Sequence, residues 1–262
     1  MTDPVLIVGA AMGGLRTAES LRRAGYSGSI RVIGDELHAP YNRPPLSKDV
    51  LATDVTHEAV AFPARAETAD VEWMLGSRAA SADLSARTVT TDDGAVTGYS
   101  ALVIATGLRP RRLDPRHHAI RTLDDAMALR AELVPGARVT VIGSGFLGCE
   151  LAATATKLGC TVTVVTPSRE PMIRPLGEML AAELRRRLEL DGVVFRLESS
   201  ELPDADVVVE AIGSDCNSEW LAGTGLDLSD GVLADNALRA VTLEGTALDE
   251  VYVVGDIARF PN

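Results

Sequence analysis

Residues 139–148 read VTVIGSGFLG, a strand-like run that ends in a complete G-x-G-x-x-G. Helical spacing follows from Cys149 to Leu158, and a second strand-like run occupies residues 161–165. This order is typical of a β-α-β unit whose glycines let the backbone approach a pyrophosphate at the N-terminus of the helix. The stretch therefore predicts a dinucleotide-binding unit. Its candidate binding residues are Gly143, Gly145, Phe146, Leu147 and Gly148.

The same order of elements occurs near the start of the chain. An apolar run at residues 5–8 precedes GAAMGG at 9–14, helical spacing from Leu15 to Arg23 and another apolar run at 30–33. Ala11 replaces the middle glycine, which leaves a plain strand-to-helix turn open as an alternative. Asp35 stands near the place, about 20 residues on, where an acid meets ribose hydroxyls, although a surface-loop acid also fits. The two units predict an α/β fold with two Rossmann-like, three-layer nucleotide-binding domains.

Composition and charge exclude several function classes. Of the 262 residues, 25 are Lys or Arg and 37 are Asp or Glu, so the net charge of −12 opposes binding to nucleic acid. No run approaches the roughly 20 apolar residues that cross a bilayer, so we expect no membrane association. The apolar stretch from Val5 to Leu15 follows no basic residue and contains glycines, which favours a cytoplasmic protein over a signal peptide.

Cysteine and histidine spacing predicts no metal site. The chain has three cysteines, Cys149, Cys160 and Cys216, and they form no C-x-x-C pair. Its four histidines show no zinc-like spacing. We therefore expect free, mostly buried thiols.

The octapeptide YNRPPLSK occupies residues 41–48. Its prolines fix the backbone, and Arg43 and Lys48 flank them as candidate phosphate or cofactor contacts. A solvated lysine is the alternative for Lys48. Two further short segments complete the pattern, Ala-Thr-Gly at residues 105–107 and Val-Gly-Asp at residues 254–256.

This set of segments, in this order, resembles the FAD-dependent, NAD(P)H-linked ferredoxin reductases of the putidaredoxin reductase type, within the pyridine nucleotide-disulfide oxidoreductase superfamily. The resemblance runs over the entire chain. It implies that Gly9, Gly13 and Gly14 bring the FAD pyrophosphate to the first helix and that Asp35 holds the adenosine ribose. The other implied FAD contacts are Arg43, Lys48, Ala80, Thr106, Gly107, Arg121 and Asp256. For Arg121, capping of a helix that begins at Leu123 stays open.

The resemblance also implies the chemistry. Hydride passes from a nicotinamide to FAD, and single electrons pass on to an iron–sulfur ferredoxin that supplies a monooxygenase or dioxygenase. No cysteine precedes Cys149, which removes a thiol relay at the flavin. Lys48 with Glu150 is the expected catalytic pair that controls charge near the flavin; a first-turn glutamate favoured by the helix dipole is the alternative for Glu150. Two other functions stay open, a flavin reductase for rubredoxin or a quinone and a non-catalytic FAD- and NAD-binding remnant.

Coenzyme choice depends on the segment after residues 161–165. Thr166 replaces the acid that accepts from the NAD ribose, while Arg169 and Arg174 follow within reach of a 2′-phosphate. A solvated loop arginine is the alternative for Arg169. Gly213 completes the expected NAD(P) contacts. Family precedent favours NADH and leaves NADPH open.

The order of the segments predicts a discontinuous FAD domain. Residues 1–112 and 232–262 would form it around an NAD(P) domain at 113–231, and the family's hairpin before residue 207 would be shortened. We also expect the family's C-terminal interface domain to be absent. A locally basic stretch could steer an acidic ferredoxin, a solvated surface being the alternative. Its arginines are Arg109, Arg111, Arg112, Arg116, Arg121 and Arg130.

Overall fold

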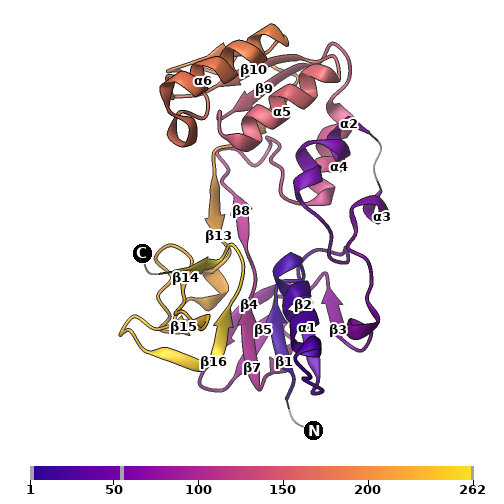
Figure 1. Ribbon diagram of the computed structural model, residues 1–262, viewed down its shortest axis with the longest axis vertical. Coiled ribbons are helices and arrows are strands. Elements are labelled where there is room, and N and C mark those ends of the chain that lie inside the picture. The colour runs from indigo at the N-terminus through magenta and orange to yellow at the C-terminus, as the bar shows by residue number, and fades with distance from the viewer. Residues whose placement is uncertain (1–2, 54–55, 261–262) are drawn as a thin grey trace. The chain divides into compact units, whose positions relative to one another are not determined.

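The computed structural model describes residues 3–53 and 56–260, which form two compact units (Figure 1). The first unit contains the chain up to Asn42, Ala61–Arg109 and the chain from Cys216 onward. The second unit contains Arg43–Val60 and Pro110–Asp215. Strands β8 (Leu108–Pro110) and β13 (Ser214–Cys216) pair where the chain passes from one unit to the other.

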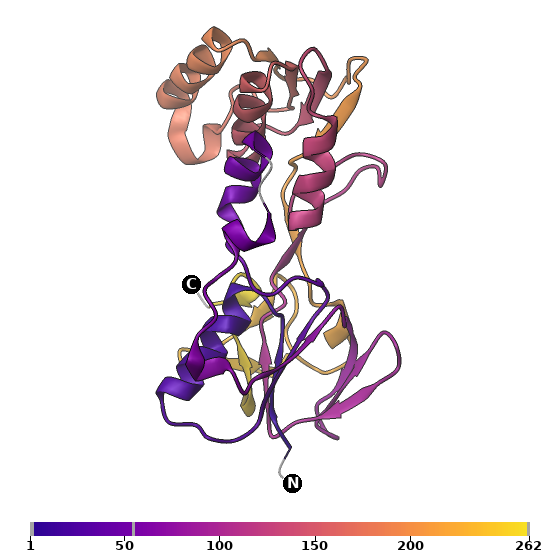
Figure 2. The same cartoon turned by 90° about the vertical axis from the view of Figure 1, so that its right-hand side faces the viewer.

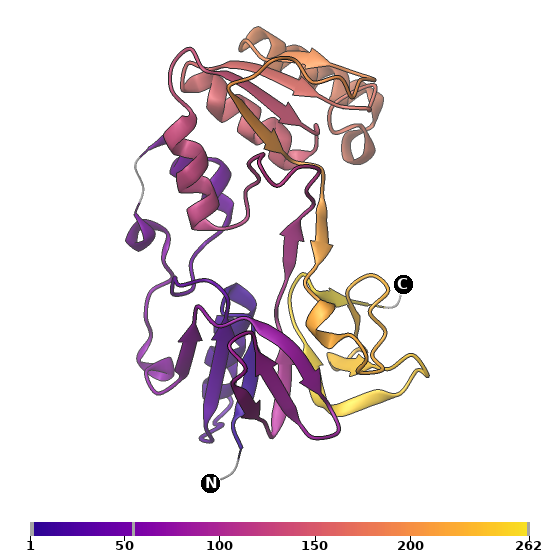
Figure 3. The same cartoon turned by 180° about the vertical axis from the view of Figure 1, so that it is seen from behind.

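A six-stranded sheet forms the centre of the first unit. Its order is β15-β16-β7-β1-β2-β3, and every neighbouring pair is parallel except β15 with β16 at one edge (yellow in Figure 3). The strands are β1 (Val5–Val8), β2 (Ile30–Gly34), β3 (Glu72–Leu75), β7 (Ala101–Ile104), β15 (Arg239–Val241) and β16 (Ala247–Val253). Strand β1 is apolar and buried on both faces, as the central strand of a parallel sheet must be.

Alternate residues of β1 belong to different cores. Leu6 and Val8 pack with Trp220 on one face of the sheet, and Val5 and Ile7 pack with Ala18 of α1 (Met12–Arg23) on the other. This alternation follows from the two-residue period of a strand. The remaining elements of the unit are β4 (Ala79–Asp83), β5 (Thr88–Thr91), β6 (Val96–Gly98), β14 (Val232–Leu233), β17 (Ala258–Arg259), η2 (Ala66–Thr68) and η3 (Glu219–Leu221).

The second unit contains a four-stranded parallel sheet in the order β11-β10-β9-β12. Its strands are β9 (Arg138–Ile142), β10 (Thr161–Val165), β11 (Val194–Arg196) and β12 (Val207–Glu210). Its helices are η1 (Pro44–Ser47), α2 (Asp49–Ala52), α3 (His57–Val60), α4 (Leu123–Glu132), α5 (Phe146–Lys157) and α6 (Ile173–Leu190). Helix α5 packs on β9 and β10, and α2 packs against α4 and α5 (Figure 2).

The predicted α/β class with parallel, Rossmann-like sheets is confirmed. The compact units group the chain in another way than the predicted cofactor domains: residues 43–60 and 110–112 belong to the second unit, and residues 216–231 to the first. The domain boundaries stay a prediction. Which cofactor each unit holds stays a prediction, since packing defines the units and not their ligands. Within residues 3–53 and 56–260, no helix is both long and apolar enough to cross a membrane.

Candidate functional site

The first glycine of each glycine-rich turn is required by the backbone. Gly9 has φ +122°, and a Cβ there would lie 2.1 Å from the carbonyl oxygen of Ala105. Gly143 has φ +103°, and its Cβ would lie 2.4 Å from the carbonyl oxygen of Ala211. Both conformations and both contacts exclude a side chain. The two turns therefore have the same backbone geometry. In each, the first glycine packs against the residue that directly follows a neighbouring strand of the same sheet, β7 for Gly9 and β12 for Gly143.

The later positions of the two turns also correspond. A Cβ on Gly14 or on Gly148 would lie 2.0 or 2.1 Å from the carbonyl oxygen of the first glycine of the same turn. At the middle position, in contrast, a Cβ on Gly145 would meet nothing within 4 Å, and the first turn carries Ala11 there. The middle position thus borders open space, where a ligand can approach the backbone.

Both turns lead into helices whose N-termini have no side-chain cap. Ala11 and Gly145 are the N-cap residues of α1 and α5, and neither helix has a side-chain cap hydrogen bond or an acid in its first turn. Helix α4 differs, because Thr122 and Asp125 form a reciprocal capping box. The positive ends of α1 and α5 therefore remain available to a phosphate, whereas that of α4 is satisfied within the protein.

A cavity of about 400 Å³ in the first unit collects four of the predicted residues. Gly9, Asp35, Ala80 and Thr106 line it. Gly9, Asp35 and Thr106 follow β1, β2 and β7, whose carboxyl ends meet at one edge because these strands are parallel. The cavity thus lies where a Rossmann-like sheet places a nucleotide.

Sequence patterns missed part of the cavity wall. Ser77, Arg78, Asp92, Asn217, Glu219 and Trp220 also line it. Two hydrogen bonds join Asn217 to the segment after β7: its side-chain amide donates to the backbone carbonyl oxygen of Thr106 at 2.9 Å, and its backbone carbonyl oxygen accepts from the Thr106 hydroxyl at 2.7 Å. Arg109 donates to the carbonyl oxygen of Cys216 at 2.8 Å. These contacts connect residues about 110 positions apart in the chain, so no local sequence pattern could have predicted them.

Three more predicted residues lie along the same sheet edge. A Cβ on Gly13 would make ordinary contacts, 3.6 Å from the Ala105 methyl carbon and 3.7 Å from the Val254 carbonyl oxygen. Gly107 has φ +63° directly after Thr106. Asp256 is exposed in the turn after β16, which pairs in parallel with β7. The structure therefore places all three near the first glycine-rich turn.

In the second unit, the predicted pair Lys48 and Glu150 is in contact. The ammonium lies 3.0 Å from one carboxylate oxygen of Glu150, and the Ser47 hydroxyl donates to the other at 2.8 Å. Thr154 donates to the Ser47 carbonyl oxygen at 3.0 Å. Glu150 and Thr154 thus hold the segment after the double proline on one side of α5.

Arg43 and Arg121 also meet. The Arg43 guanidinium donates to the carbonyl oxygen of Arg121, while the backbone N–H of Arg121 donates to Asp125 at 3.0 Å. The backbone of Arg121 therefore belongs to the start of α4.

The residues predicted to contact NAD(P) lie next to the second turn. Thr166 is buried, and its hydroxyl accepts from the Ser144 hydroxyl at 2.9 Å and from the Ser168 N–H at 3.2 Å. Arg169 pairs with Glu178. Gly213, with φ +101°, follows β12 beside the turn. Thr166 therefore supports the turn from inside the protein, whereas Arg169 is exposed at its border.

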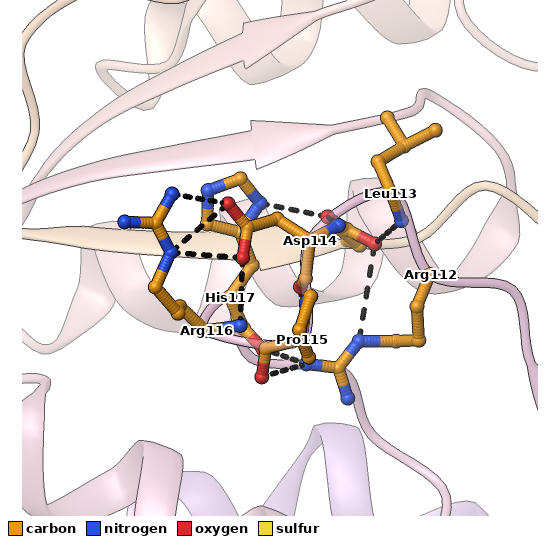
Figure 4. A network of polar contacts seen from close by, with 7 residues as sticks. Arg112, Leu113, Asp114, Pro115, Arg116 and His117 are labelled. Atoms are coloured by element: carbon orange, nitrogen blue, oxygen red, sulfur yellow. Dashed lines mark hydrogen bonds and ion pairs between the residues drawn. The ribbon is translucent and has the colours of Figure 1, made fainter.

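A buried carboxylate that the sequence did not single out anchors residues 112–117 (Figure 4). Glu210, at the end of β12, accepts from the N–H of Leu113 at 2.6 Å, from the N–H of Asp114 at 3.0 Å and contacts Nδ1 of His117 at 2.7 Å. Burial raises the pKa of Glu210, but these donors together hold it below its ordinary value. Glu210 therefore remains an ionised structural anchor.

The locally basic stretch is compensated by acids. Arg109 pairs with Glu219, Arg111 with Asp215, and Arg116 with Asp114. These pairs leave little net positive charge for long-range attraction of an acidic partner.

The model of the pyridine nucleotide-disulphide oxidoreductase family matches residues 3–201. The chain belongs to the pyridine nucleotide-disulphide oxidoreductase family. A relative from Paraburkholderia xenovorans, "Biphenyl dioxygenase system ferredoxin--NAD(+) reductase component", is 34% identical over all of this chain and 69% of its own length. A "Rubredoxin-NAD(+) reductase" from Pseudomonas putida is 32% identical over 97% of this chain and 71% of its own length. The reductase in "the covalent putidaredoxin reductase-putidaredoxin complex" matches with TM-score 0.89 and 28% identity over 99% of this chain and 69% of that one. The predicted resemblance to ferredoxin reductases is confirmed.

The cysteines of this family member are not arranged for disulphide chemistry. The chain has three free thiols, Cys149, Cys160 and Cys216. Burial raises the pKa of Cys149 to about 11, with a smaller contribution from the charge of Glu150, and burial also raises the pKa of Cys160. These two residues are therefore thiols at neutral pH and poor nucleophiles. In the part of the chain that the structure describes, no cluster of three His, Cys, Asp or Glu side chains could hold a metal ion.

Proposed function

We propose that this chain is an FAD-dependent NAD(P)H:ferredoxin reductase that passes electrons to an iron–sulfur ferredoxin of a monooxygenase or dioxygenase system. The observation that carries the proposal is the duplicated glycine-rich turn, one in each unit, with an unused helix N-terminus behind each. A single enzyme that brings two nucleotides together needs two such sites. The ferredoxin–NAD(+) reductase relative, identical at 34% of positions, supports this assignment.

The cavity of the first unit fits the adenosine diphosphate half of FAD. Gly9 and the N-terminus of α1 would take the pyrophosphate, Asp35 the ribose, and the backbone at Ala80 the adenine. When bound, FAD supplies the acceptor for a hydride and the donor of single electrons. The protein's own task is then to position the two cofactors and to control charge around them.

Lys48 and Glu150 are proposed to control the charge around the cofactors. Glu150 accepts from both Lys48 and Ser47, so the ammonium is held in one direction instead of rotating freely in water. Because Glu150 offsets the charge of Lys48, the pair would supply an oriented, charged N–H donor to a reduced cofactor and little net positive charge. Arg43, whose guanidinium donates to the carbonyl oxygen of Arg121, would contribute positive charge together with Arg121.

The nicotinamide coenzyme would bind at the second turn. Gly145, Phe146 and Leu147 open α5, and Gly148 allows the close crossing of turn and helix. We propose NADH as the preferred coenzyme, which the relatives named as ferredoxin–NAD(+) reductases support. NADPH would also be accepted, because no carboxylate stands at Thr166 and Arg169 borders the turn.

The test is a spectrum followed by an anaerobic titration. The purified chain, supplied with FAD, should show a bound flavin band that bleaches on addition of NADH, and a ferredoxin should then restore the band. A protein that retains no FAD, or a bound flavin that NADH does not bleach, would contradict the proposal and favour the non-catalytic alternative. The relative named as a rubredoxin reductase supports a second candidate acceptor, so restoration by rubredoxin but not by ferredoxin would decide for that function.

A further inference from the structure

The loop that carries Arg169 is fastened to the second glycine-rich turn at both ends. At its start, the buried hydroxyls of Ser144 and Thr166 share a hydrogen bond of 2.9 Å. At its end, the N–H of Met172 donates to the carbonyl oxygen of Ser144 at 2.9 Å. Residues 166–172 therefore form a border of the turn, at the position where a Rossmann-like site meets the adenosine ribose.

This border offers no free carboxylate at the end of β10. The hydroxyl of Thr166 is already used by Ser144 and Ser168, and Glu170, the acid within the loop, binds Arg185 at 2.8 Å. At Thr166, a ribose 2′-hydroxyl therefore lacks the acidic partner typical of NAD-selective sites. Two exposed charged residues lie beside the loop: Arg196 pairs in register with Val165, and the N–H of Glu198 donates to the carbonyl oxygen of Ser168 at 3.2 Å. The border therefore carries charges of both signs.

Within residues 166–172 the cation is Arg169, and its ion-pair partner comes from helix α6. Its guanidinium pairs with Glu178, and the side chains are 64% and 70% exposed. Glu178 directly follows Gly177, where α6 is interrupted: Gly177 has φ +72° and lies outside the helical region. An exposed pair of this kind is weak and open to competition, and a phosphate is a strong competitor for an arginine.

We propose that Glu178 is a specificity-determining residue, which disfavours NADPH by occupying Arg169 and by repelling the 2′-phosphate. NADH lacks this phosphate, so the Arg169–Glu178 pair hinders the binding of NADH less than the binding of NADPH. The inference rests on the proposed function, since it assigns the selectivity of the same nicotinamide site. Coenzyme choice then depends on Glu178 of helix α6 as well as on the loop that carries Arg169.

The experiment measures binding of NAD⁺ and NADP⁺ to the full chain by calorimetry, which needs no turnover. Glu178→Gln should raise the ratio of NADP⁺ affinity to NAD⁺ affinity by about fivefold, the upper range for one exposed ion pair. In the Arg169→Gln background the same change should raise the ratio less, because the ion pair is gone and only the repulsion between Glu178 and the 2′-phosphate is left to remove.

Glu183→Gln is the matched control. Glu183 lies on the same helix, is 60% exposed and pairs with Arg186 at 2.7 Å, so its replacement changes net charge equally and should leave the ratio unchanged. An unchanged ratio in Glu178→Gln, or an equal rise in Glu183→Gln, would overturn the inference. A chain that bound neither nucleotide would instead refute the proposed function, and the inference with it.

Discussion

At the scale of single residues, the glycines of the second turn have separate tasks. Gly143 is required by the fold, since its Cβ would overlap the Ala211 carbonyl group and its φ is +103°. Gly145 has φ −76°, which any residue adopts, and its Cβ would meet open space. Ala11 already occupies the equivalent place in the first turn. Gly143 thus serves the stability of the fold, whereas Gly145 is proposed to serve the approach of a ligand.

Alanine substitutions should separate these tasks. Gly143→Ala should lower the free energy of unfolding by about 3 kcal/mol, through strain and backbone overlap. Gly145→Ala should cost less than about 1 kcal/mol but weaken NAD⁺ binding about tenfold, because its methyl group occupies the approach to the pyrophosphate. Urea unfolding and calorimetry measure the two effects. Undiminished NAD⁺ affinity in Gly145→Ala would show that the pyrophosphate lies elsewhere.

At the scale of elements, local patterns predicted both β-α-β units, because each unit is a contiguous stretch with its own period and glycines. The wall formed by Asn217 and Trp220 could not be predicted, since it depends on a return of the chain to β7 from more than a hundred residues away. The docking of residues 43–52 on α4 was missed for the same reason, whereas the family resemblance implied the contact of Lys48 with Glu150 on α5. The anchoring role of Glu210 could not be predicted, because a single acid at the end of an apolar strand is also typical of a residue that simply ends the strand.

Glu210 provides a prediction for the element that it anchors. Its folded-state pKa is lowered from 4.5, so the ionised carboxylate stabilises the fold fully above that value and loses its contribution as the pH falls through the folded-state pKa. Glu210→Gln should therefore cost about 2 kcal/mol at neutral pH and less in acid. Urea unfolding of both proteins across this range measures the difference. A gap that stays constant below pH 4.5 would contradict the prediction, and exposed Glu244→Gln is the control.

At the scale of the whole molecule, charge limits how this chain meets its electron acceptor. The sequence predicted a basic stretch able to steer an acidic ferredoxin, but Arg109, Arg111 and Arg116 are each paired with a carboxylate, and the net charge is −12. A pattern of one residue type could not reveal this, because the acids that compensate the first two arginines lie about a hundred positions further along the chain. Association with a net-negative ferredoxin is therefore repulsive at long range.

Added salt should consequently accelerate electron transfer from this chain to a net-negative ferredoxin. Raising the ionic strength shortens the screening length to about 10 Å at 0.1 M, which weakens the repulsion between the two proteins. Stopped-flow rates of ferredoxin reduction, measured at limiting ferredoxin across a salt series, provide the measurement. A basic one-electron acceptor protein is the control and should slow down in the same series. A ferredoxin rate that falls steeply with salt would show that a local positive surface outweighs the net charge, and would restore the basic stretch as the docking site.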